Sequence, residues 1–366
     1  MAALASETRA INNELQYISI INYIIKYIRG RRAIRPKVVV TNLAEPAAIS
    51  VLTPHADVVA NDRPAPWSRK ELIERSGEAF GILAFMTDAV DDDLLRRCRS
   101  LQIVAGALKG ADNIDVAACS RRGIWVSVVP DLLSAPTADL AVGLLLALSR
   151  NLVTGDRLVR SGGFTGWRPI LFGRGLEGAT VGIVGMGTLG RALARRLRAF
   201  GCRLLYVDDH PLPPTEERLL AVERRRLAVM AAEADILVLA LPLEPRSVHL
   251  VNRRLLATLR PGCLLINAAR GSLVDEEAVA DFLEEGRLGG YAADVFAFED
   301  MSRADRPRTV PDRLRAMPDR TVLTPHLGSA VADARRAIVT EAALNIVDCL
   351  EGRRPRCAIN DPESRQ

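Results

Sequence analysis

Short apolar runs alternate with helical stretches along the chain from Pro36 onward. Each run is three to six residues long, which suits a strand buried on both faces. Strands that alternate with helices predict parallel sheets covered by helices, as in α/β proteins. The first series of predicted strands is Val38–Val40, Asp57–Ala60, Ile82–Phe85, Ile103–Ala105 and Trp125–Val128. The second series is Thr180–Val184, Arg203–Val207, Ile236–Leu241, Leu264–Asn267, Gly290–Val295 and Val322–Thr324.

A nearly continuous apolar helix is predicted between the two series, at Thr137–Asn151. A helix that is apolar on all sides must be buried, either between domains or against a second subunit. The length of 366 residues exceeds that of a usual single domain, so we expect two domains. The predicted fold class is α/β, with two doubly wound parallel-sheet domains, Rossmann or flavodoxin-like, and a cleft between them.

Residues 1–35 differ from the rest in composition. They hold three of the five tyrosines and six basic residues against two acidic ones. Their apolar part, Leu15 to Ile28, is interrupted by Asn22 and Lys26 and is too short to span a membrane. No small-residue cleavage site follows it, which argues against a signal peptide. We interpret 1–35 as a dispensable extension; a targeting or docking helix is the alternative.

The remaining composition excludes several classes of protein. After residue 35 there are 43 basic and 42 acidic residues, so no basic face for nucleic acid is indicated. The six cysteines form no CxxC pair, so neither a disulfide framework nor a metal site is expected, and a reducing cytoplasm is favoured.

A glycine-rich motif follows the first strand of the second series. Residues 180–190 read TVGIVGMGTLG and open a predicted helix, Thr188–Phe200. In a dinucleotide fold, Gly185 allows the tight turn, Gly187 lets a pyrophosphate approach the backbone, and Gly190 packs helix against strand. The free N–H groups at the start of that helix suit phosphate.

Two carboxylates end the next strand, at Asp208 and Asp209. Asp208 can accept hydrogen bonds from the adenosine ribose hydroxyls, and both charges would repel the 2′-phosphate of NADP. The predicted cofactor is therefore NAD.

Four further segments stand where predicted strands end: ALKGADNID from Ala107, NAARGSLVD from Asn267, ADVFAFED from Ala293 and TPHLGS from Thr324. Together with the glycine motif, their order across residues 36–357 resembles the D-2-hydroxyacid dehydrogenase family. The resemblance implies that Arg270 binds the substrate anion and that His326, paired with Glu299, is the acid/base. By spacing alone, Asp300 could replace Glu299. One departure is Asp139, where the family usually has Glu.

These residue types also suit the chemistry by themselves. Hydride transfer requires a group that gains or loses a proton, and histidine titrates near neutrality. A paired carboxylate orients the imidazole, and a guanidinium binds an oxyanion in two places. Of the four histidines, we interpret His55 as a packing or surface residue, His210 as lying near adenosine, and His249 as part of a connection.

Lys109 suggests a particular substrate. Only three lysines follow residue 35, among many arginines, so a compact ammonium in the ALKGADN loop indicates an added positive charge at the substrate site. This lysine resembles that of the phosphite (phosphonate) dehydrogenases, as do Val129–Leu133, Ser161–Trp167 and the run from Glu299 to Arg308. Phe172, where a tyrosine is expected, departs from that resemblance. The substrate residues that it implies are Met86, Lys109, Arg270, Glu299, His326 and Arg335, with Trp167 reaching into the partner subunit's site.

The sequence therefore predicts an NAD-dependent oxidation of phosphite to phosphate by a homodimer without membrane or nucleic-acid partners. A D-2-hydroxyacid dehydrogenase and a non-catalytic NAD-sensing binder are the alternatives. We expect 36–133 and 320–357 to form the substrate-binding domain, 134–319 the NAD-binding domain and 358–366 a tail. The predicted cofactor contacts are Gly185, Gly187, Thr188, Leu189, Gly190, Asp208, Thr137, Leu241, Pro242, Ala269, Asp294 and Ser329.

Overall fold

Two parallel sheets organise the computed structural model, which describes residues 35–129 and 131–363. The predicted extension at 1–35 lies almost wholly outside the described residues. The first sheet has five strands in the order β2-β1-β3-β4-β5, all paired in parallel. Its strands are β1 (Lys37–Leu43), β2 (Asp57–Asn61), β3 (Gly81–Ala84), β4 (Ile103–Gly106) and β5 (Trp125–Val128).

The second sheet has seven strands in the order β12-β11-β10-β9-β6-β7-β8. The chain runs outward from β6 to β8 on one side, then returns to β9 and continues to β12 on the other. This reversal beside β6 is the switch point at which α/β sheets bind ligands. Its strands are β6 (Thr180–Val184), β7 (Arg203–Val207), β8 (Val222–Arg224), β9 (Ile236–Leu239), β10 (Cys263–Asn267), β11 (Leu288–Ala293) and β12 (Thr321–Leu323).

Helices cover both faces of each sheet, which explains why the strands are apolar throughout. On the first sheet, α2 (Pro46–Leu52) and α14 (Ala332–Leu350) share one core. The opposite core contains α3 (Arg69–Ser76), α4 (Asp92–Arg97) and α5 (Val116–Arg121).

The second sheet alternates in the same way. Leu204 and Tyr206 of β7 enter one core and Leu205 enters the other, as the two-residue period of a strand requires. The first of these cores is shared with α6 (Ser134–Ser149), α8 (Thr188–Arg198) and α9 (Pro214–Leu220). The second is shared with α10 (Leu227–Glu233), α11 (Arg253–Leu256), α12 (Glu276–Glu284) and α13 (Asp312–Arg315).

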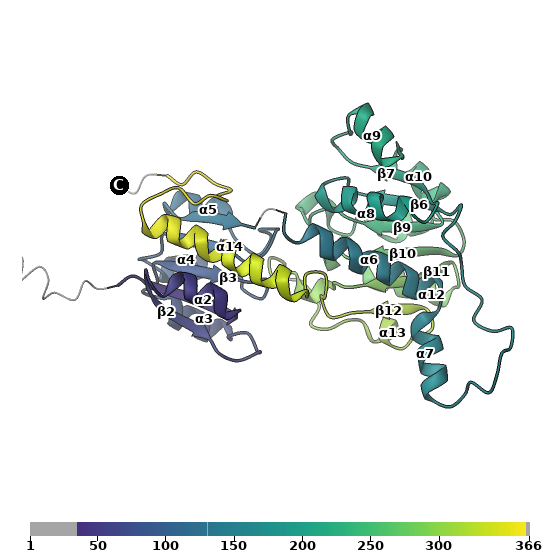
Figure 1. Cartoon of the computed structure of the whole chain (residues 1–366), viewed down its shortest axis with the longest axis horizontal. Coiled ribbons are helices and arrows are strands. Elements are labelled where there is room, and N and C mark those ends of the chain that lie inside the picture. Colours follow the sequence, from purple (N-terminus) through teal and green to yellow (C-terminus); the bar gives the residue numbers. More distant parts are fainter. Residues whose placement is uncertain (1–34, 130, 364–366) are drawn as a thin grey trace, which may run out of the picture.

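Two segments connect the sheets. The long apolar helix predicted at Thr137–Asn151 is α6, which packs against α8 and strands β10 to β12, although Asp139 and Gly143 on its outer side are exposed. After β12 the chain returns through α14, which lies along the first sheet in Figure 1. The two sheets therefore form two lobes joined by two crossings of the chain.

The expected division of the chain differs from the structure at two places. Strand β12 pairs with β11, so Thr321–Leu323 belongs to the second sheet although 320 was the expected boundary. The segment expected to be a tail begins with residues packed on β5. There Asn360 accepts a hydrogen bond from the Val126 N–H at 2.8 Å, and its amide donates to the Ile124 carbonyl at 3.0 Å.

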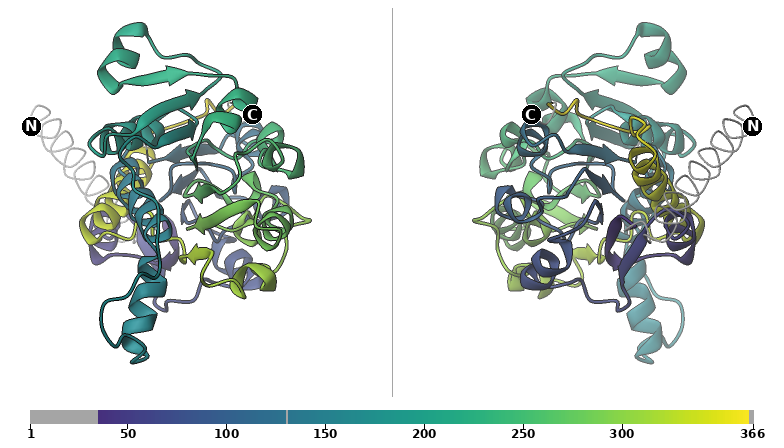
Figure 2. Two further views of the ribbon diagram at one scale, coloured as in Figure 1. Left: turned by 90° about the vertical axis from the view of Figure 1, so that its right-hand side faces the viewer. Right: turned by 90° about the vertical axis from the view of Figure 1, so that its left-hand side faces the viewer.

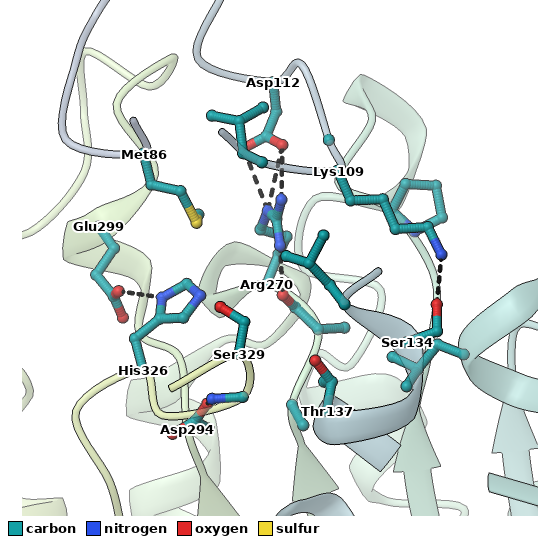
Figure 3. Close-up of a pocket in the computed structure, with 18 of the residues that line it drawn as sticks. Met86, Lys109, Asp112, Ser134, Thr137, Arg270, Asp294, Glu299, His326 and Ser329 are labelled. Atoms are coloured by element: carbon teal, nitrogen blue, oxygen red, sulfur yellow. Dashed lines mark hydrogen bonds and ion pairs between the residues drawn. The ribbon is translucent and has the colours of Figure 1, made fainter. Parts of the chain in front are cut away.

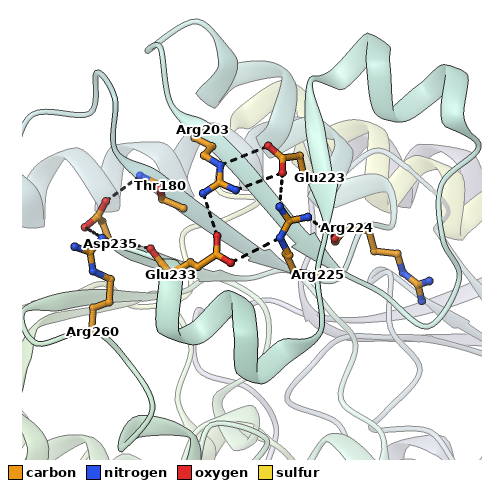
Figure 4. A network of polar contacts seen from close by, with 8 residues as sticks. All are labelled: Thr180, Arg203, Glu223, Arg224, Arg225, Glu233, Asp235 and Arg260. Atoms are coloured by element: carbon orange, nitrogen blue, oxygen red, sulfur yellow. Dashed lines mark hydrogen bonds and ion pairs between the residues drawn. The ribbon is translucent and has the colours of Figure 1, made fainter.

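Charged side chains form a network at the amino ends of the second sheet's strands (Figure 4). Arg203 contacts Glu223 at 3.3 Å and Glu233 at 3.0 Å. Beside it, Asp235 contacts Arg260 at 3.1 Å and accepts a hydrogen bond from the Thr180 N–H at 3.0 Å. The network lies opposite the glycine motif, so these arginines have a structural role distant from the cofactor site.

Helix α7 (Leu152–Arg160) and the segment 161–173 stand away from the body of the molecule (Figure 2). In the described part of the chain, no single helix is long and apolar enough to cross a membrane; only α6 and α7 together, bent by 64°, meet that length and composition. The exposed apolar side chains of this projection are Leu152, Val153, Val159, Phe164, Trp167, Ile170, Leu171 and Phe172.

Candidate active site

A pocket of about 640 Å³ lies between the two lobes. Its lining combines the loops after β3 and β4 of the first sheet with the carboxyl ends of the second sheet's strands (Figure 3). Of the predicted residues, the lining includes Met86, Lys109, Thr137, Gly187, Thr188, Leu189, Leu241, Pro242, Ala269, Arg270, Asp294, Glu299, His326, Ser329 and Arg335.

His326 and Glu299 form a pair at one side of this pocket. The Nδ1 of His326 lies 2.7 Å from Oε2 of Glu299. Glu299 ends the 3₁₀ turn η3 (Ala297–Glu299), and its Oε1 accepts a hydrogen bond from the Phe296 N–H at 2.7 Å. His326 has a φ of 55°, an uncommon conformation for a residue other than glycine. The carboxylate thus orients the ring and leaves Nε2 for other contacts.

Asp294 holds the loop that carries His326. Its carboxylate accepts hydrogen bonds from the Thr324 hydroxyl at 2.6 Å, the Leu327 N–H at 2.7 Å and the Gly328 N–H at 2.8 Å. Its carbonyl accepts a further hydrogen bond from the His326 N–H at 2.9 Å. The predicted cofactor residue is therefore also what keeps His326 in its strained conformation.

Arg270 follows β10 and is held by Asp112 of the first lobe. Its Nε donates to the two Asp112 oxygens at 3.2 and 3.3 Å, and its Nη1 donates to the Ala269 carbonyl at 2.9 Å. Both side chains are largely buried. Sequence reasoning missed Asp112; its position three residues after Lys109, in the same loop, was the available signal.

Lys109 points in a different direction from the one we expected. Its Nζ donates to the Ser134 hydroxyl at 2.6 Å and to the Thr188 hydroxyl, and lies 3.7 Å from Asp131. In Figure 3 the side chain runs toward Ser134 and away from Arg270. Burial lowers the pKa of Lys109, which Asp131 partly offsets. Lys109 lines the pocket, but its ammonium lies at the start of α8 and not beside Arg270.

Met86 and Arg335 complete the lining on the first lobe and α14. The guanidinium of Arg335 lies 5.8 Å from the centre of the Phe85 ring, and its Nη1 is 3.5 Å from the Ser329 hydroxyl. Burial lowers the pKa of Arg335. Sequence reasoning missed Asn42 and Thr87, which also line the pocket and are joined by a hydrogen bond of 3.3 Å.

The charges around the pocket are balanced. The cations Lys109, Arg270 and Arg335 face three lining carboxylates. Asp112 contacts Arg270 directly, and Glu299 contacts His326. The added positive charge that Lys109 was expected to bring to the substrate site is therefore offset within the pocket lining. The third lining carboxylate, that of Asp294, accepts hydrogen bonds from the loop that carries His326.

The glycine motif has the geometry that a dinucleotide needs. Gly185 has a φ of 97°, and a Cβ there would lie 2.7 Å from the Ala240 carbonyl oxygen. A Cβ on Gly190 would lie 2.1 Å from the Gly185 oxygen, so helix and turn pack closely. A Cβ on Gly187 would meet nothing within 4 Å, and Gly187 lines the pocket. The start of α8 is thus open to a phosphate group.

The carboxylates after β7 differ in their roles. Asp208 accepts hydrogen bonds from the Met186 N–H at 2.6 Å and the His210 N–H at 2.8 Å, so it supports the glycine turn. Asp209 instead lies 2.6 Å from the exposed Arg246. The expected repulsion of a 2′-phosphate by both charges stays a prediction: Asp208 already accepts two backbone hydrogen bonds, and Arg246 offsets the charge of Asp209.

Some predicted residues lie outside the pocket lining. The glycine turn itself is formed by Gly185 and Gly190, and Asp208 supports it by accepting a hydrogen bond from the Met186 N–H. Trp167 is 88% exposed on the projecting segment, so its predicted place in a partner's site remains a prediction. Among the described residues, no cluster of three or more histidine, cysteine or carboxylate side chains could hold a metal ion.

Comparisons with known proteins agree with this geometry. Residues 142–328 match the model of the D-isomer specific 2-hydroxyacid dehydrogenase family, NAD binding domain. A glyoxylate reductase of Pyrococcus furiosus is 35% identical over 331 residues, covering 89% of this chain and 96% of that protein.

Solved structures give the same result. The TT0316 protein of Thermus thermophilus is 34% identical with a TM-score of 0.80, covering 88% of this chain and 100% of that one. The NADPH-dependent glyoxylate/hydroxypyruvate reductase of Sinorhizobium meliloti, solved with NADP and malonate, is 29% identical with a TM-score of 0.77, covering 91% and 99%. The chain therefore belongs to the D-isomer specific 2-hydroxyacid dehydrogenase family and contains its NAD-binding domain.

Proposed function

We propose that this protein is an NAD-dependent dehydrogenase that interconverts a small 2-hydroxy acid and its 2-keto acid. The observation that carries the proposal is the His326–Glu299 pair at 2.7 Å in the same pocket as Arg270. The relatives named glyoxylate reductase support a substrate of this class. When bound, the dinucleotide supplies the acceptor or donor of hydride.

The side chains have separate tasks in this reaction. Arg270, oriented by Asp112, binds the substrate carboxylate. Nε2 of His326 takes the hydroxyl proton during oxidation and returns it to the carbonyl oxygen during reduction, while Glu299 stabilises the imidazolium. Met86 covers the first-lobe side of the pocket and limits substrate size. In oxidation, the C–H hydride and the O–H proton leave together as the carbonyl forms.

Phosphite is the second candidate substrate. The observation that favours it is that the six residues assigned by resemblance to phosphite dehydrogenases line one pocket: Met86, Lys109, Arg270, Glu299, His326 and Arg335. The balanced reaction is phosphite plus NAD and water giving phosphate, NADH and a proton. His326 would accept the proton of the water that attacks phosphorus as the P–H hydride leaves. The balanced charges of the lining do not by themselves favour this dianion.

A single set of assays distinguishes the candidates. NADH consumption is measured with glyoxylate and hydroxypyruvate, and NADH formation with phosphite, D-lactate and D-glycerate, with phosphate determined as a product. Turnover of keto acids without turnover of phosphite supports the first candidate. The reverse result, with inhibition by sulfite, which lacks a P–H bond, replaces it with phosphite oxidation. Binding of NADH without turnover of any substrate would instead support the NAD-sensing protein.

The two lobes divide the work in this proposal. The first sheet with α14 is the substrate-binding domain, because it provides Met86, Lys109, Asp112 and Arg335. The second sheet provides the glycine motif together with Arg270, Glu299 and His326. We also propose that the protein is a homodimer whose subunits meet at α7 and 161–173, where exposed apolar side chains cluster.

A further inference from the structure

Lys109 connects the two lobes at the beginning of α8. It lies in the loop after β4 of the first sheet, yet its ammonium contacts Thr188, the first residue of a helix on the second sheet. Ser134, at the start of α6, donates from its hydroxyl to that of Thr188 at 3.0 Å and accepts from Lys109. Three side chains from three elements thus meet at one point.

This point is where the glycine motif receives a phosphate. The N-cap of α8 is Gly187, which has no side chain to satisfy the N–H groups of the first turn. An anion bound there accepts hydrogen bonds from those N–H groups and is stabilised by the helix dipole. The pyrophosphate of a dinucleotide is the anion that this motif holds in Rossmann folds. The Lys109 ammonium contacts the hydroxyl of Thr188, the residue that follows Gly187.

The contacts of Lys109 leave its charge available. Both partners at hydrogen-bonding distance, Ser134 and Thr188, are neutral hydroxyls. The carboxylate of Asp131 is farther away, at 3.7 Å, and mostly exposed, so solvent weakens this ion pair. A half-buried ammonium whose hydrogen-bond partners are neutral attracts a nearby phosphate, because its surroundings screen the interaction less than bulk water does.

We propose that Lys109 binds the pyrophosphate of the dinucleotide, so that the first lobe also contacts the cofactor that the second lobe binds. The substrate anion is then bound mainly by Arg270, whose guanidinium lies on the other side of the pocket. This inference rests on the NAD-binding domain and not on the identity of the substrate. It gives the loop 107–113 of the first lobe a direct contact with the cofactor.

The test measures binding of ADP-ribose, which carries the pyrophosphate but no nicotinamide, and of adenosine, which carries neither. Titration calorimetry compares wild type with Lys109→Met and Lys109→Arg. We expect Lys109→Met to weaken ADP-ribose binding by about tenfold, as for loss of one charge-assisted contact, and to leave adenosine binding unchanged. Lys109→Arg retains the charge and should restore binding to within about threefold of wild type.

Lys70→Met is the matched control. Lys70 is exposed on α3 and pairs with Glu74 at 3.8 Å, far from the glycine motif, so its loss should not change ADP-ribose binding. If Lys109→Met proves unstable on heating, Lys109→Gln repeats the measurement with a polar side chain of similar length.

Hydrogen exchange gives a second readout. ADP-ribose should protect the backbone amides of residues 107–113 in wild type but not in Lys109→Met, and adenosine should protect them in neither. Equal ADP-ribose affinity in wild type and both neutral variants, without protection of 107–113, would overturn the proposal and leave Lys109 as a substrate residue only. Because no substrate is present, this outcome is independent of whether the protein turns over keto acids or phosphite.

Discussion

The carboxylate of Asp300 accepts a hydrogen bond from the Ser272 N–H at 2.7 Å. It thereby ties the turn after Arg270 to the turn that ends at Glu299. The two turns also touch through their backbones, since a Cβ on Gly271 would lie 1.8 Å from the Phe296 carbonyl carbon. Burial raises the pKa of Asp300, and the hydrogen bonds from Ser272 oppose that rise. Asp300 is therefore a positioning residue for both Arg270 and Glu299.

Replacing Asp300 by Ala should reduce kcat/KM about tenfold, because the buried Ser272 N–H would lose its acceptor at a cost of about 1–3 kcal/mol. Asp300→Asn keeps an acceptor oxygen and should recover most of the activity. The loss should appear in kcat more than in KM if the turn carrying Glu299 shifts. Asp305→Ala, at an exposed aspartate, is the control. Wild-type kinetics in Asp300→Ala would refute the positioning role.

The sequence predicted most strands, because buried strands follow from simple periodicity. The candidate site residues came from the ends of strands and from the family resemblance; the structure brings most of them to one pocket, and their roles stay predictions. Buried strands such as Thr180–Val184 and Trp125–Val128 were located at their observed bounds. Strand β8 was missed because only Val222 of its three residues is buried, so no apolar run marks it.

Other features depend on contacts between distant parts of the chain. Spacing left Glu299 and Asp300 equivalent, and only the fold directs one to His326 and the other to Ser272. Asp112 meets Arg270 across 158 residues; its place in the loop after Lys109 suggests a site residue but does not specify this partner. The direction of Lys109 likewise depends on how the two lobes meet.

Replacing His326 by Gln should lower kcat/KM about 10²- to 10⁴-fold, as expected for loss of a general acid/base. Glu299→Gln retains an oxygen for the Phe296 N–H but cannot stabilise an imidazolium, so a smaller loss is expected. Steady-state kinetics with the best substrate measures both. His55→Gln, at a histidine outside the pocket lining, should behave as wild type. A loss of less than tenfold in His326→Gln would mean that another group transfers the proton.

Stability should fall as pH rises because of Asp88. Burial raises the pKa of Asp88 from its ordinary value of 3.8 to about 6, so the folded state holds this proton more tightly than the unfolded state. The contribution is fully present below pH ~4 and is lost as pH rises through ~6, an effect on the order of 3 kcal/mol. Asp88→Asn should therefore gain stability over wild type at pH 8 and match it near pH 4.

The substitution suits the site, because the Phe85 N–H and the Thr41 hydroxyl both donate to the same Asp88 oxygen, which an amide oxygen replaces. Chemical denaturation at both pH values measures the difference. Asp333→Asn, at an exposed aspartate, controls for a change of charge alone. The same gain at pH 4 and pH 8 would show that titration of Asp88 is not its cause.

The choice between NAD and NADP should respond to Asp209. The wild type should prefer NAD, because Asp208 follows β7 and would repel a 2′-phosphate, while Asp209 pairs with Arg246 at 2.6 Å and so keeps that cation from binding one. Asp209→Asn leaves Arg246 paired only through its Nε with Glu244 at 2.8 Å, so its Nη groups can bind a 2′-phosphate and the ratio of kcat/KM for NAD over NADP should fall about tenfold. Adding Arg246→Ala should reverse the change. An unchanged ratio in Asp209→Asn would show that Arg246 does not reach the ribose.

Association of two subunits should depend on the projection formed by α7 and residues 161–173. Trp167 and Phe172 are 88% and 83% exposed there, and the Asn151 amide fastens the segment to α7 through the Leu171 carbonyl at 3.2 Å. An apolar surface of this kind indicates a protein interface. Sedimentation velocity should give about twice the chain mass of 39.8 kDa.

Replacing both Leu152 and Phe172 by Glu should convert the dimer to a monomer, because two charges would have to be buried at the interface. Leu219→Glu, at an exposed leucine on α9, should remain dimeric. Trp167→Ser separates assembly from catalysis: if this side chain enters the partner subunit's site, activity falls while the dimer persists. A wild-type protein that sediments as a monomer at all concentrations would contradict the homodimer and leave the projection for another partner.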